Sequence, residues 1–264
     1  MGAVKTRSVP AVERALRLLE VLAESKRGYT LSELARVLRL PRSSTHCLLL
    51  TLERQGYLHR HEETGRYMFG AKLLNLANMA LSRIELRERA APYLHALMRR
   101  TGLTVHMAIL DRGEAVLVEK VEPPGLVRLA TWIGKRMDIH CTGVGKALLA
   151  YLPEGEVERL IRERGLPRHN ENTIVSPKRL REELRRIRER GYSLDDEEDE
   201  LGLRCLGAPI FDHMGRVVAS VSVAGTIAQI TGENMAELAE AVKETAAAIS
   251  RQLGFAPEGE KEEA

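Results

Sequence analysis

The sequence predicts an α+β protein, in which an N-terminal winged helix-turn-helix is joined by a linker helix to an α/β domain with a mainly antiparallel sheet. Three observations support this fold class. Short helical periodicities dominate the first 70 residues, paired runs typical of strands appear only beyond residue 102, and charge is divided unevenly between these parts. A chain of 264 residues, 44% of them hydrophobic, is long enough for two such domains.

The basic charge is concentrated near the N-terminus. Residues 1–75 contain 13 Lys and Arg against 7 Asp and Glu, whereas the remainder contains 27 against 30. The overall net charge of +3 therefore conceals a basic part and an acidic part. Such asymmetry is typical of a chain that binds nucleic acid at one end, although a solvated basic surface would give the same count.

Residues 9–25 form the first expected helix. Apolar side chains that recur at helical spacing would form its buried face: Val12, Ala15, Leu16, Leu19 and Leu22. Gly28 interrupts this pattern. The following TLSE is a capping box, in which Thr30 and Glu33 satisfy free amides at the start of a short second helix that ends near Arg39.

A third helix is predicted to begin around Pro41, which suits a first helical turn, and to end at Gln55 before a C-capping Gly56. Two helices separated by a tight turn give the outline of a helix-turn-helix. The residue types at the exposed leading end of this helix can reach DNA bases and phosphates. They are Arg42, Ser43, Ser44 and His46.

Two short apolar-polar alternations in YLHRHEETGRYMFG, residues 57–70, predict a hairpin that would form the wing of this domain. Arg60, His61 and Arg66 flank its tip and could contact the DNA backbone or the minor groove. The DNA-binding domain would thus span residues 9–70. The alternative is a small helical bundle with a solvated basic face.

Residues 71–84 are expected to form the linker helix, and residues 85–255 the second domain. Two strand hairpins are predicted there, from residues 103–110 with 114–121 and from residues 205–212 with 216–225. Helices are expected at residues 85–100, 143–151, 154–164, 177–190 and 233–253. Strand pairs interrupted by helices indicate an α+β domain. The ends of the chain, residues 1–8 and 256–264, are expected to be disordered.

The stretch DIHCTGVGKALLAYL, residues 138–152, invites comparison with a phosphate-binding loop. A Walker A loop would need glycine at His140 and a hydroxyl residue at Ala147, so this interpretation fails at two positions. A dinucleotide-binding fingerprint fails as well, because Leu148 stands where its third glycine belongs. Free amides at the start of a helix still favour an anion such as a carboxylate.

Three segments in order, AVERALRLLEVL, YTLSELARVLRLPRSSTHCLLLTLERQGYL and YMFGAKLLNLA, resemble the IclR family of bacterial transcriptional regulators. The resemblance covers about residues 9–254. It implies a regulator of double-stranded DNA operators that forms a homodimer, or a homotetramer made of two dimers, and that a small molecule controls. Cys47 stands where members often carry a polar or basic residue, so the base preference is not carried over.

The resemblance also implies an effector pocket for a small molecule, and the free amides at the start of the helix expected at residues 143–151 favour a carboxylate-bearing metabolite there. The matching positions are Met137, Gly143, Val144, Asp195, Leu203, Cys205 and Ser222. They would combine apolar walls with a few polar groups, as ligand pockets do. Ala224 stands where some members have a second serine, which puts a very polar ligand such as glyoxylate in doubt. The alternative is plain packing, in which Gly143 and the cysteines only allow close approach.

The acidic run from Asp195 to Glu200 is expected to be a solvated turn with Asp195 facing inward. A calcium loop of the EF-hand type is excluded, because Glu200 occupies the position that requires glycine.

A cysteine-dependent enzyme is one alternative function. Cys141 would be the nucleophile, with His140, His106 or His169 as the base. Because adjacent strand residues point to opposite faces, His140 cannot easily serve Cys141. We therefore expect no catalytic activity.

A metal- or redox-sensing regulator is the other alternative. It would use Cys141 and Cys205 with Asp195 and either His140 or His106, although their spacing is not diagnostic. The main expectation is a protein without a metal or another cofactor.

The cysteines and the hydropathy pattern indicate the compartment. Three cysteines without a C-x-x-C pair suggest reduced thiols. The sequence has no run of about 18 apolar residues, and MGAVKTRSVP lacks the apolar block of a signal peptide. We therefore expect a cytoplasmic protein with no membrane partner.

Overall fold

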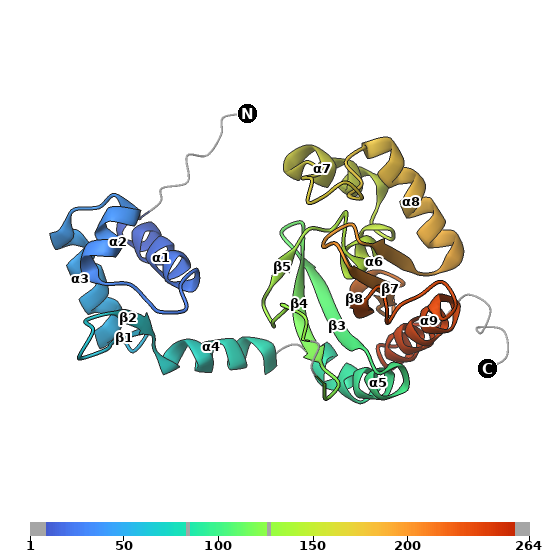
Figure 1. Cartoon of the computed structure of the whole chain (residues 1–264), viewed down its shortest axis with the longest axis horizontal. Helices are drawn as coiled ribbons and strands as arrows, with labels where there is room; N and C mark the ends of the chain where they lie inside the picture. The colour runs from blue at the N-terminus through green and yellow to red at the C-terminus, as the bar shows by residue number, and fades with distance from the viewer. Residues whose placement is uncertain (1–8, 83–84, 126–127, 257–264) are drawn as a thin grey trace. The chain divides into compact units, whose positions relative to one another are not determined.

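A computed structural model of the chain describes residues 9–82, 85–125 and 128–256 (Figure 1). The chain divides into two compact units, and the division falls between residues 83 and 84. Residues 1–8 and 257–264, for which disorder was predicted, lie outside the described residues, as do the last two residues of the predicted linker helix.

The smaller unit is a winged helix-turn-helix domain followed by one further helix. Its elements are α1 (Pro10–Ala23), α2 (Leu31–Leu38), α3 (Arg42–Arg54), β1 (Leu58–Arg60), β2 (Tyr67–Phe69) and α4 (Ala71–Ser82). The two strands pair antiparallel as the wing. The core takes side chains from α1–α3 and the wing: Leu18, Leu22, Leu34, Leu38, Leu49, Leu58 and Tyr67. The predicted order of helices, turn and wing is confirmed.

The buried face of α1 agrees with the predicted one only in part: Leu22 is buried and Leu19 packs against the core, as predicted. Leu18 and Leu22 are buried, whereas Val12 and Leu16 are 54% and 55% exposed. Helix α1 carries two apolar stripes at overlapping helical spacings, and the core covers the stripe that contains Leu18 and Leu22. Val12 and Leu16 therefore remain as an apolar surface of this unit.

The ends of α2 and α3 follow from local hydrogen bonds. In the predicted capping box, the Thr30 amide donates to the Glu33 carboxylate at 2.7 Å, and the Glu33 amide donates to the Thr30 hydroxyl at 3.3 Å. Pro41 precedes α3 as its N-cap, rather than occupying its first turn as predicted. Gly56 follows α3 with a φ of +77°, a conformation that favours glycine.

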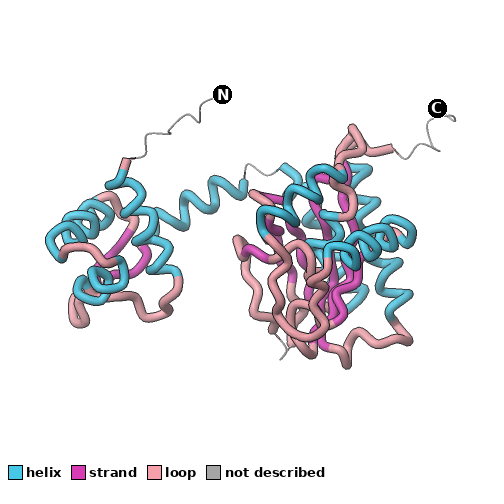
Figure 2. The backbone as a smooth tube through the Cα atoms, turned by 90° about the horizontal axis from the view of Figure 1, so that it is seen from above, coloured by secondary structure: helices cyan, strands magenta, loops and turns pink. Residues whose placement is uncertain are grey.

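The larger unit contains a six-stranded antiparallel sheet with helices around it (Figures 1 and 2). The strand order is β5-β4-β3-β8-β7-β6. The strands are β3 (Thr104–Asp111), β4 (Glu114–Val121), β5 (Arg136–Met137), β6 (Ser193–Asp196), β7 (Leu203–Phe211) and β8 (Val217–Thr226). The helices are α5 (Glu85–Thr101), α6 (Gly143–Leu149), α7 (Glu154–Arg164), α8 (Pro177–Arg190) and α9 (Met235–Gln252). Both predicted hairpins are confirmed, whereas β5 and β6 were not predicted.

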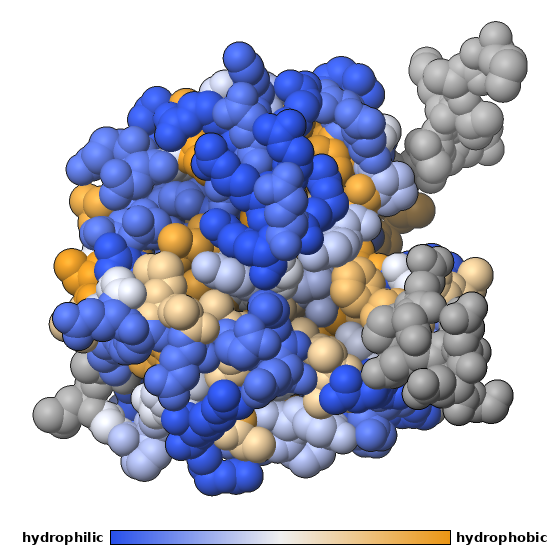
Figure 3. Space-filling view, turned by 90° about the vertical axis from the view of Figure 1, so that its right-hand side faces the viewer, coloured by the Kyte–Doolittle hydropathy of each residue, from blue (hydrophilic) through white to orange (hydrophobic). Residues whose placement is uncertain are grey.

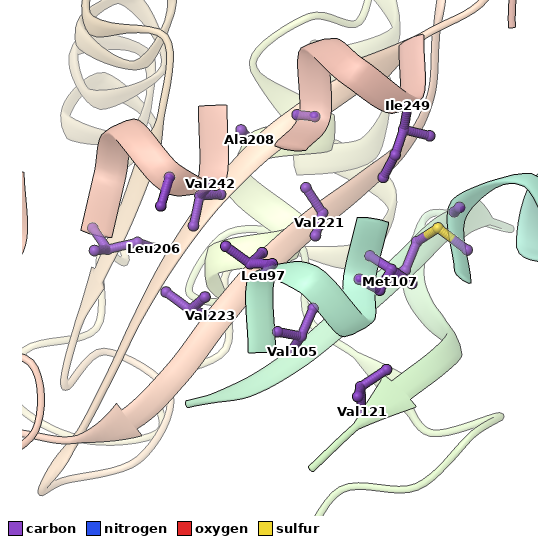
Figure 4. Packing of buried hydrophobic residues seen from close by; sticks show 14 of the residues in the cluster. Leu97, Val105, Met107, Val121, Leu206, Ala208, Val221, Val223, Val242 and Ile249 are labelled. Carbon is purple, nitrogen blue, oxygen red and sulfur yellow. The ribbon is translucent and has the colours of Figure 1, made fainter. Parts of the chain in front are cut away.

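Helices α5 and α9 pack on one face of this sheet and form its main core (Figure 4). Leu97 of α5 and Val242 of α9 meet strand side chains such as Val105, Val221 and Leu206, all of which are buried. Burial of such side chains contributes about 1.5–3 kcal/mol each to folding.

The other face carries α6, with α7 and α8 packed outside it in a second core. All seven residues of α6 are buried, so this short helix lies between the sheet and the outer helices. Among the described residues, no helix is both long and apolar enough to cross a membrane.

Candidate functional site

The exposed start of α3 carries the residues that were predicted to contact DNA. Arg42, Ser43 and His46 are exposed, and Ser44 is half-buried. The opposite side of the helix is fixed to the domain, because Thr45 is fully buried and its hydroxyl donates to the Pro41 carbonyl at 3.1 Å. The helix thus presents basic and hydroxyl groups from a rigid base, as a recognition helix requires.

The two wing arginines differ in their surroundings. Arg60 is exposed, with its guanidinium 5.9 Å from the centre of the Tyr67 ring. Arg66 is half-buried and makes two 3.1 Å hydrogen bonds to the Glu33 carboxylate and one of 2.8 Å to the Gly28 carbonyl. Arg66 therefore ties the wing to the start of α2, a role that its predicted position at the wing tip did not suggest.

The pairing of strands in the sheet brings the residues of the second candidate site together. Residues paired across β6, β7, β8 and β3 form two neighbouring rows. One row contains Asp195, Cys205 and Ala224, and the next contains Gly207, Ser222 and His106. Because the rows are two residues apart on each shared strand, their side chains project from one face of the sheet. This is the face that α6 covers.

A cleft of about 530 Å³, including its mouth, lies between these rows and the start of α6. All seven predicted effector residues line it: Met137, Gly143, Val144, Asp195, Leu203, Cys205 and Ser222. Nine further residues complete the lining: His106, Leu129, Ala130, Thr131, Lys135, Thr142, Asp199, Glu200 and Ala224. The pairing of His106 with Ser222 across β3 and β8 could have identified His106. No sequence pattern places the lining residues between β4 and β5, or those of the acidic run, at this cleft.

Residues 129–131, which precede β5, are held at the cleft by hydrogen bonds. Lys120 donates to the carbonyls of Leu129, at 3.0 Å, and Thr131, at 2.8 Å. The His106 ring and the Thr131 hydroxyl are 2.8 Å apart. Burial, assisted by the charges of Lys120 and Lys135, lowers the pKa of His106 to about 3. His106 is therefore neutral at physiological pH, which leaves Lys135 as the cation of the lining.

Asp195 is the most deeply buried carboxyl group in the cleft, with 3% of the residue exposed. Its Oδ1 accepts hydrogen bonds from the amides of Glu198, at 2.8 Å, and Asp199, at 3.4 Å. Burial raises the pKa of Asp195 to about 7, against the opposing charge of Lys146. This side chain is consequently close to half-protonated at neutral pH and can donate as well as accept a hydrogen bond.

The acidic run is less exposed than predicted. Asp195 is buried on strand β6, in agreement with its predicted inward position, but Glu198 is also buried, with only 7% of the residue exposed. Only part of the run is a solvated turn, because buried Lys146 of α6 holds Glu198 against the sheet layer.

Lys146, which made the sequence resemble a phosphate loop, has a structural role. It is fully buried, and its ammonium group donates to the Glu198 carboxylate and to the Leu194 carbonyl. The second oxygen of Glu198 is buried without a hydrogen-bond partner among the described residues. The lysine thus fixes the cleft-lining acidic run to α6, and its charge is not available to a phosphate.

The alternative functions built on Cys141 obtain little support. Burial raises the pKa of the Cys141 thiol, and the His140 ring contacts the Pro167 carbonyl at 3.0 Å. The predicted metal set of Cys141 and Cys205 with Asp195 and His140 or His106 is not assembled. Among the described residues, the one group of three close metal-ligand types contains Cys141 but none of the others.

Two protein-family models match the chain. The IclR helix-turn-helix domain matches residues 11–62, and the bacterial transcriptional regulator IclR C-terminal domain matches residues 78–251. The transcriptional repressor IclR of Escherichia coli K12 is 39% identical over 251 residues, which cover 94% of this chain and 92% of that protein.

Solved structures agree with these matches. The crystal structure of Thermotoga maritima IclR has a TM-score of 0.79 and 34% identity, covering 93% of this chain and 99% of that one. An IclR homologue from Microbacterium hydrocarbonoxydans, solved in complex with 4-hydroxybenzoate, has a TM-score of 0.80 and 25% identity, covering 92% of this chain and 98% of that one.

Proposed function

This chain belongs to the IclR family of bacterial transcriptional regulators, and from that premise we propose that it acts in the cytoplasm as a dimer under the control of a small carboxylate-bearing metabolite. The observation that carries the proposal is the convergence of all seven predicted effector residues on one cleft. The effector would act by favouring one arrangement of the two DNA-binding units, which requires a difference in affinity of about 1–3 kcal/mol between arrangements.

An apolar surface of the smaller unit supports the dimer. The side chains of Val9, Val12 and Leu16 on and beside α1 are each more than half exposed. A separate open groove in the same unit is lined by Leu19, His59, Phe69, Gly70, Ala71, Leu73, Leu74 and Ala77. By contrast, the face drawn in Figure 3 is mainly hydrophilic with small separate apolar patches. A second copy would cover apolar surface of this kind and set two recognition helices about one DNA turn apart.

Selection of bound sequences from a random duplex pool, at low and moderate salt, tests the DNA-binding part of the proposal. Non-specific binding to phosphates weakens steeply as salt rises. We therefore expect a two-fold symmetric sequence that is still selected at moderate salt. Recovery of only salt-sensitive binding without sequence preference would contradict the proposal.

Replacing Arg42 with alanine should weaken binding to the selected operator by about 10- to 100-fold, the usual effect of losing one good base contact. Arg162→Ala, which removes an exposed arginine from α7 in the other unit, is the matched control for lost charge. Affinity is measured by fluorescence anisotropy at fixed salt. Equal losses in the two variants would show that Arg42 contributes only through the net charge.

The charges of the cleft constrain the effector. Among the described residues that line it, Asp195, Asp199 and Glu200 are acidic and Lys135 is the one cation. A carboxylate would be repelled if all three acids were ionised, so its binding needs a proton on Asp195 or a further positive charge. The carboxylate bound by the Microbacterium relative supports this ligand class for the present chain.

The folding stability of the protein should depend on pH through the proton on Asp195. Its pKa is about 7 in the folded protein, against an ordinary value of 3.8, so the folded state holds a proton that the unfolded state has lost. Stability is therefore expected to fall as pH rises between these values. Asp195→Asn keeps an acceptor for the Glu198 and Asp199 amides but cannot ionise, so its melting temperature should increasingly exceed that of wild type between about pH 5 and about pH 8.

The control for this pH series is Asp196→Asn, because Asp196 is the exposed neighbour on the same strand. Melting is followed by circular dichroism at constant ionic strength. A difference between Asp195→Asn and wild type that stays constant with pH would show that Asp195 is ionised throughout.

A further inference from the structure

A cluster of metal-ligand side chains lies beside the cleft and is not used by the proposed function. It consists of Asp138, Cys141 and His169. One ligand atom from each, a carboxylate oxygen, a sulfur and a ring nitrogen, lies within 4.8 Å of the other two. Among the residues that the structure describes, no other three His, Cys, Asp or Glu side chains are grouped this closely.

The cluster is assembled by two anchored segments. Asp138 and Cys141 lie on the turn before α6, which is closed by a 2.8 Å hydrogen bond from the Thr142 hydroxyl to the Asp138 carbonyl. His169 lies on the loop before α8, where its amide donates to the Thr173 hydroxyl at 3.1 Å. Both segments are therefore held in place without a bound ion, which reduces the ordering that binding would require.

The distances are close to those of a coordination sphere. The His169 Nε2 atom is 2.9 Å from Asp138 Oδ2, and its Nδ1 atom is 4.0 Å from Asp199 Oδ1. The Cys141 thiol points at the same Asp199 oxygen, 3.9 Å away. Zinc binds sulfur, nitrogen and oxygen ligands at about 2.0–2.3 Å, so its tetrahedral ligands lie roughly 3–4 Å apart.

We propose that Asp138, Cys141 and His169 bind a divalent transition-metal ion of the zinc class. One thiolate, one imidazole and one carboxylate suit zinc or cobalt better than magnesium or calcium, which prefer oxygen ligands. Binding breaks the Cys141 S–H bond and releases its proton to solvent. The ion takes the place of the hydrogen between Asp138 Oδ2 and His169 Nε2, and the neutral ring then carries its one proton on Nδ1.

The surroundings of Cys141 agree with a cation at this point. Cys141 is fully buried, and its sulfur lies 3.9 Å from Asp199 Oδ1. A cation bound here would offset the negative charges of Asp138 and Asp199, and a coordinated thiol loses its proton. The competing interpretation is that Asp138 and His169 form a half-exposed ion pair and that Cys141 is inert. Only the metal site requires a bond between the ion and the Cys141 sulfur.

Asp199 also lines the cleft, so the ion would lie against the cleft wall. The proposed function places a carboxylate in the cleft. If that is right, the ion would supply positive charge at a point where acidic residues outnumber Lys135. Metal binding itself does not depend on DNA or effector binding.

The test is a cobalt titration of the full chain after treatment with a chelator. Thiolate coordination gives a sulfur-to-cobalt charge-transfer band in the near ultraviolet, and we expect one cobalt per chain. Cys141→Ser should abolish the band, whereas Cys47→Ser and Cys205→Ser, matched thiol losses elsewhere, should retain it. His169→Ala should weaken affinity by more than the about 10- to 100-fold that loss of an outer-shell partner costs.

Three results would overturn the proposal: no band at cobalt saturation, a band that persists in Cys141→Ser, or a band that is lost in Cys205→Ser and places the ion in the cleft instead. Circular dichroism melts establish that each variant is folded. His169 is exposed, so its loss should not impair folding. Operator binding is measured separately, and its failure would leave the metal result standing.

Discussion

Replacing Lys146 with methionine should reduce the free energy of unfolding by about 3–5 kcal/mol, the usual cost of removing one partner of a buried ion pair. Methionine fills a similar volume, so the loss is mainly electrostatic. Glu198 would remain buried without its cation, and the Leu194 carbonyl would lose its donor. Burial already raises the pKa of Glu198, and the charge of Lys146 opposes that rise. Denaturant unfolding followed by circular dichroism measures the change.

The double variant Lys146→Met, Glu198→Gln separates the charge effect from general loss of packing. With both charges removed, no uncompensated ion is buried, so much of the lost stability should return. A double variant as unstable as the single one would show that the lysine stabilises the fold through the Leu194 carbonyl and not through Glu198. A single variant as stable as wild type would mean that the pair is solvated in solution.

Helix ends were predictable from sequence because capping chemistry is local. Helix α8 has the predicted bounds, with the Ser176 hydroxyl accepting from the Arg179 amide and Gly191 at a φ of +80°. The buried face of α1 was not predictable in the same way. Val12 and Leu16 have the spacing of a core stripe, and only the packing of α2 and α3 decides that Leu18 is buried instead.

The cleft was predictable only through resemblance to relatives. Strand β6 was missed because its sequence SLDD lacks strand alternation: Asp195 lines the cleft, where a core strand would place an apolar side chain. His106 and Ser222 are adjacent only through the register of β3 with β8. Lys146 and Glu198 are 52 residues apart, so no sequence periodicity connects them.

Gly207→Ala should destabilise the larger unit and weaken effector binding together. An added Cβ at Gly207 would lie 2.5 Å from the Gly143 carbonyl oxygen and 2.8 Å from the Ser193 hydroxyl. The carbonyl belongs to the backbone of α6 and is held by a 2.6 Å hydrogen bond from that hydroxyl, so it cannot move independently. Helix α6 must shift as a whole, at a typical overpacking cost of about 1–3 kcal/mol.

Gly155→Ala is the matched control, because an added Cβ there meets no atom within 4 Å and the residue lies in helix α7. It should be neutral or stabilising by about 0.5–1 kcal/mol, since alanine favours a helix over glycine. Thermal melting with and without a panel of small carboxylates measures both effects. Gly143 and Val144 form the wall of the cleft, so a shifted α6 should reduce the ligand-induced rise in melting temperature. A Gly207→Ala protein that loses stability but keeps the full ligand-induced rise would place the effector away from α6.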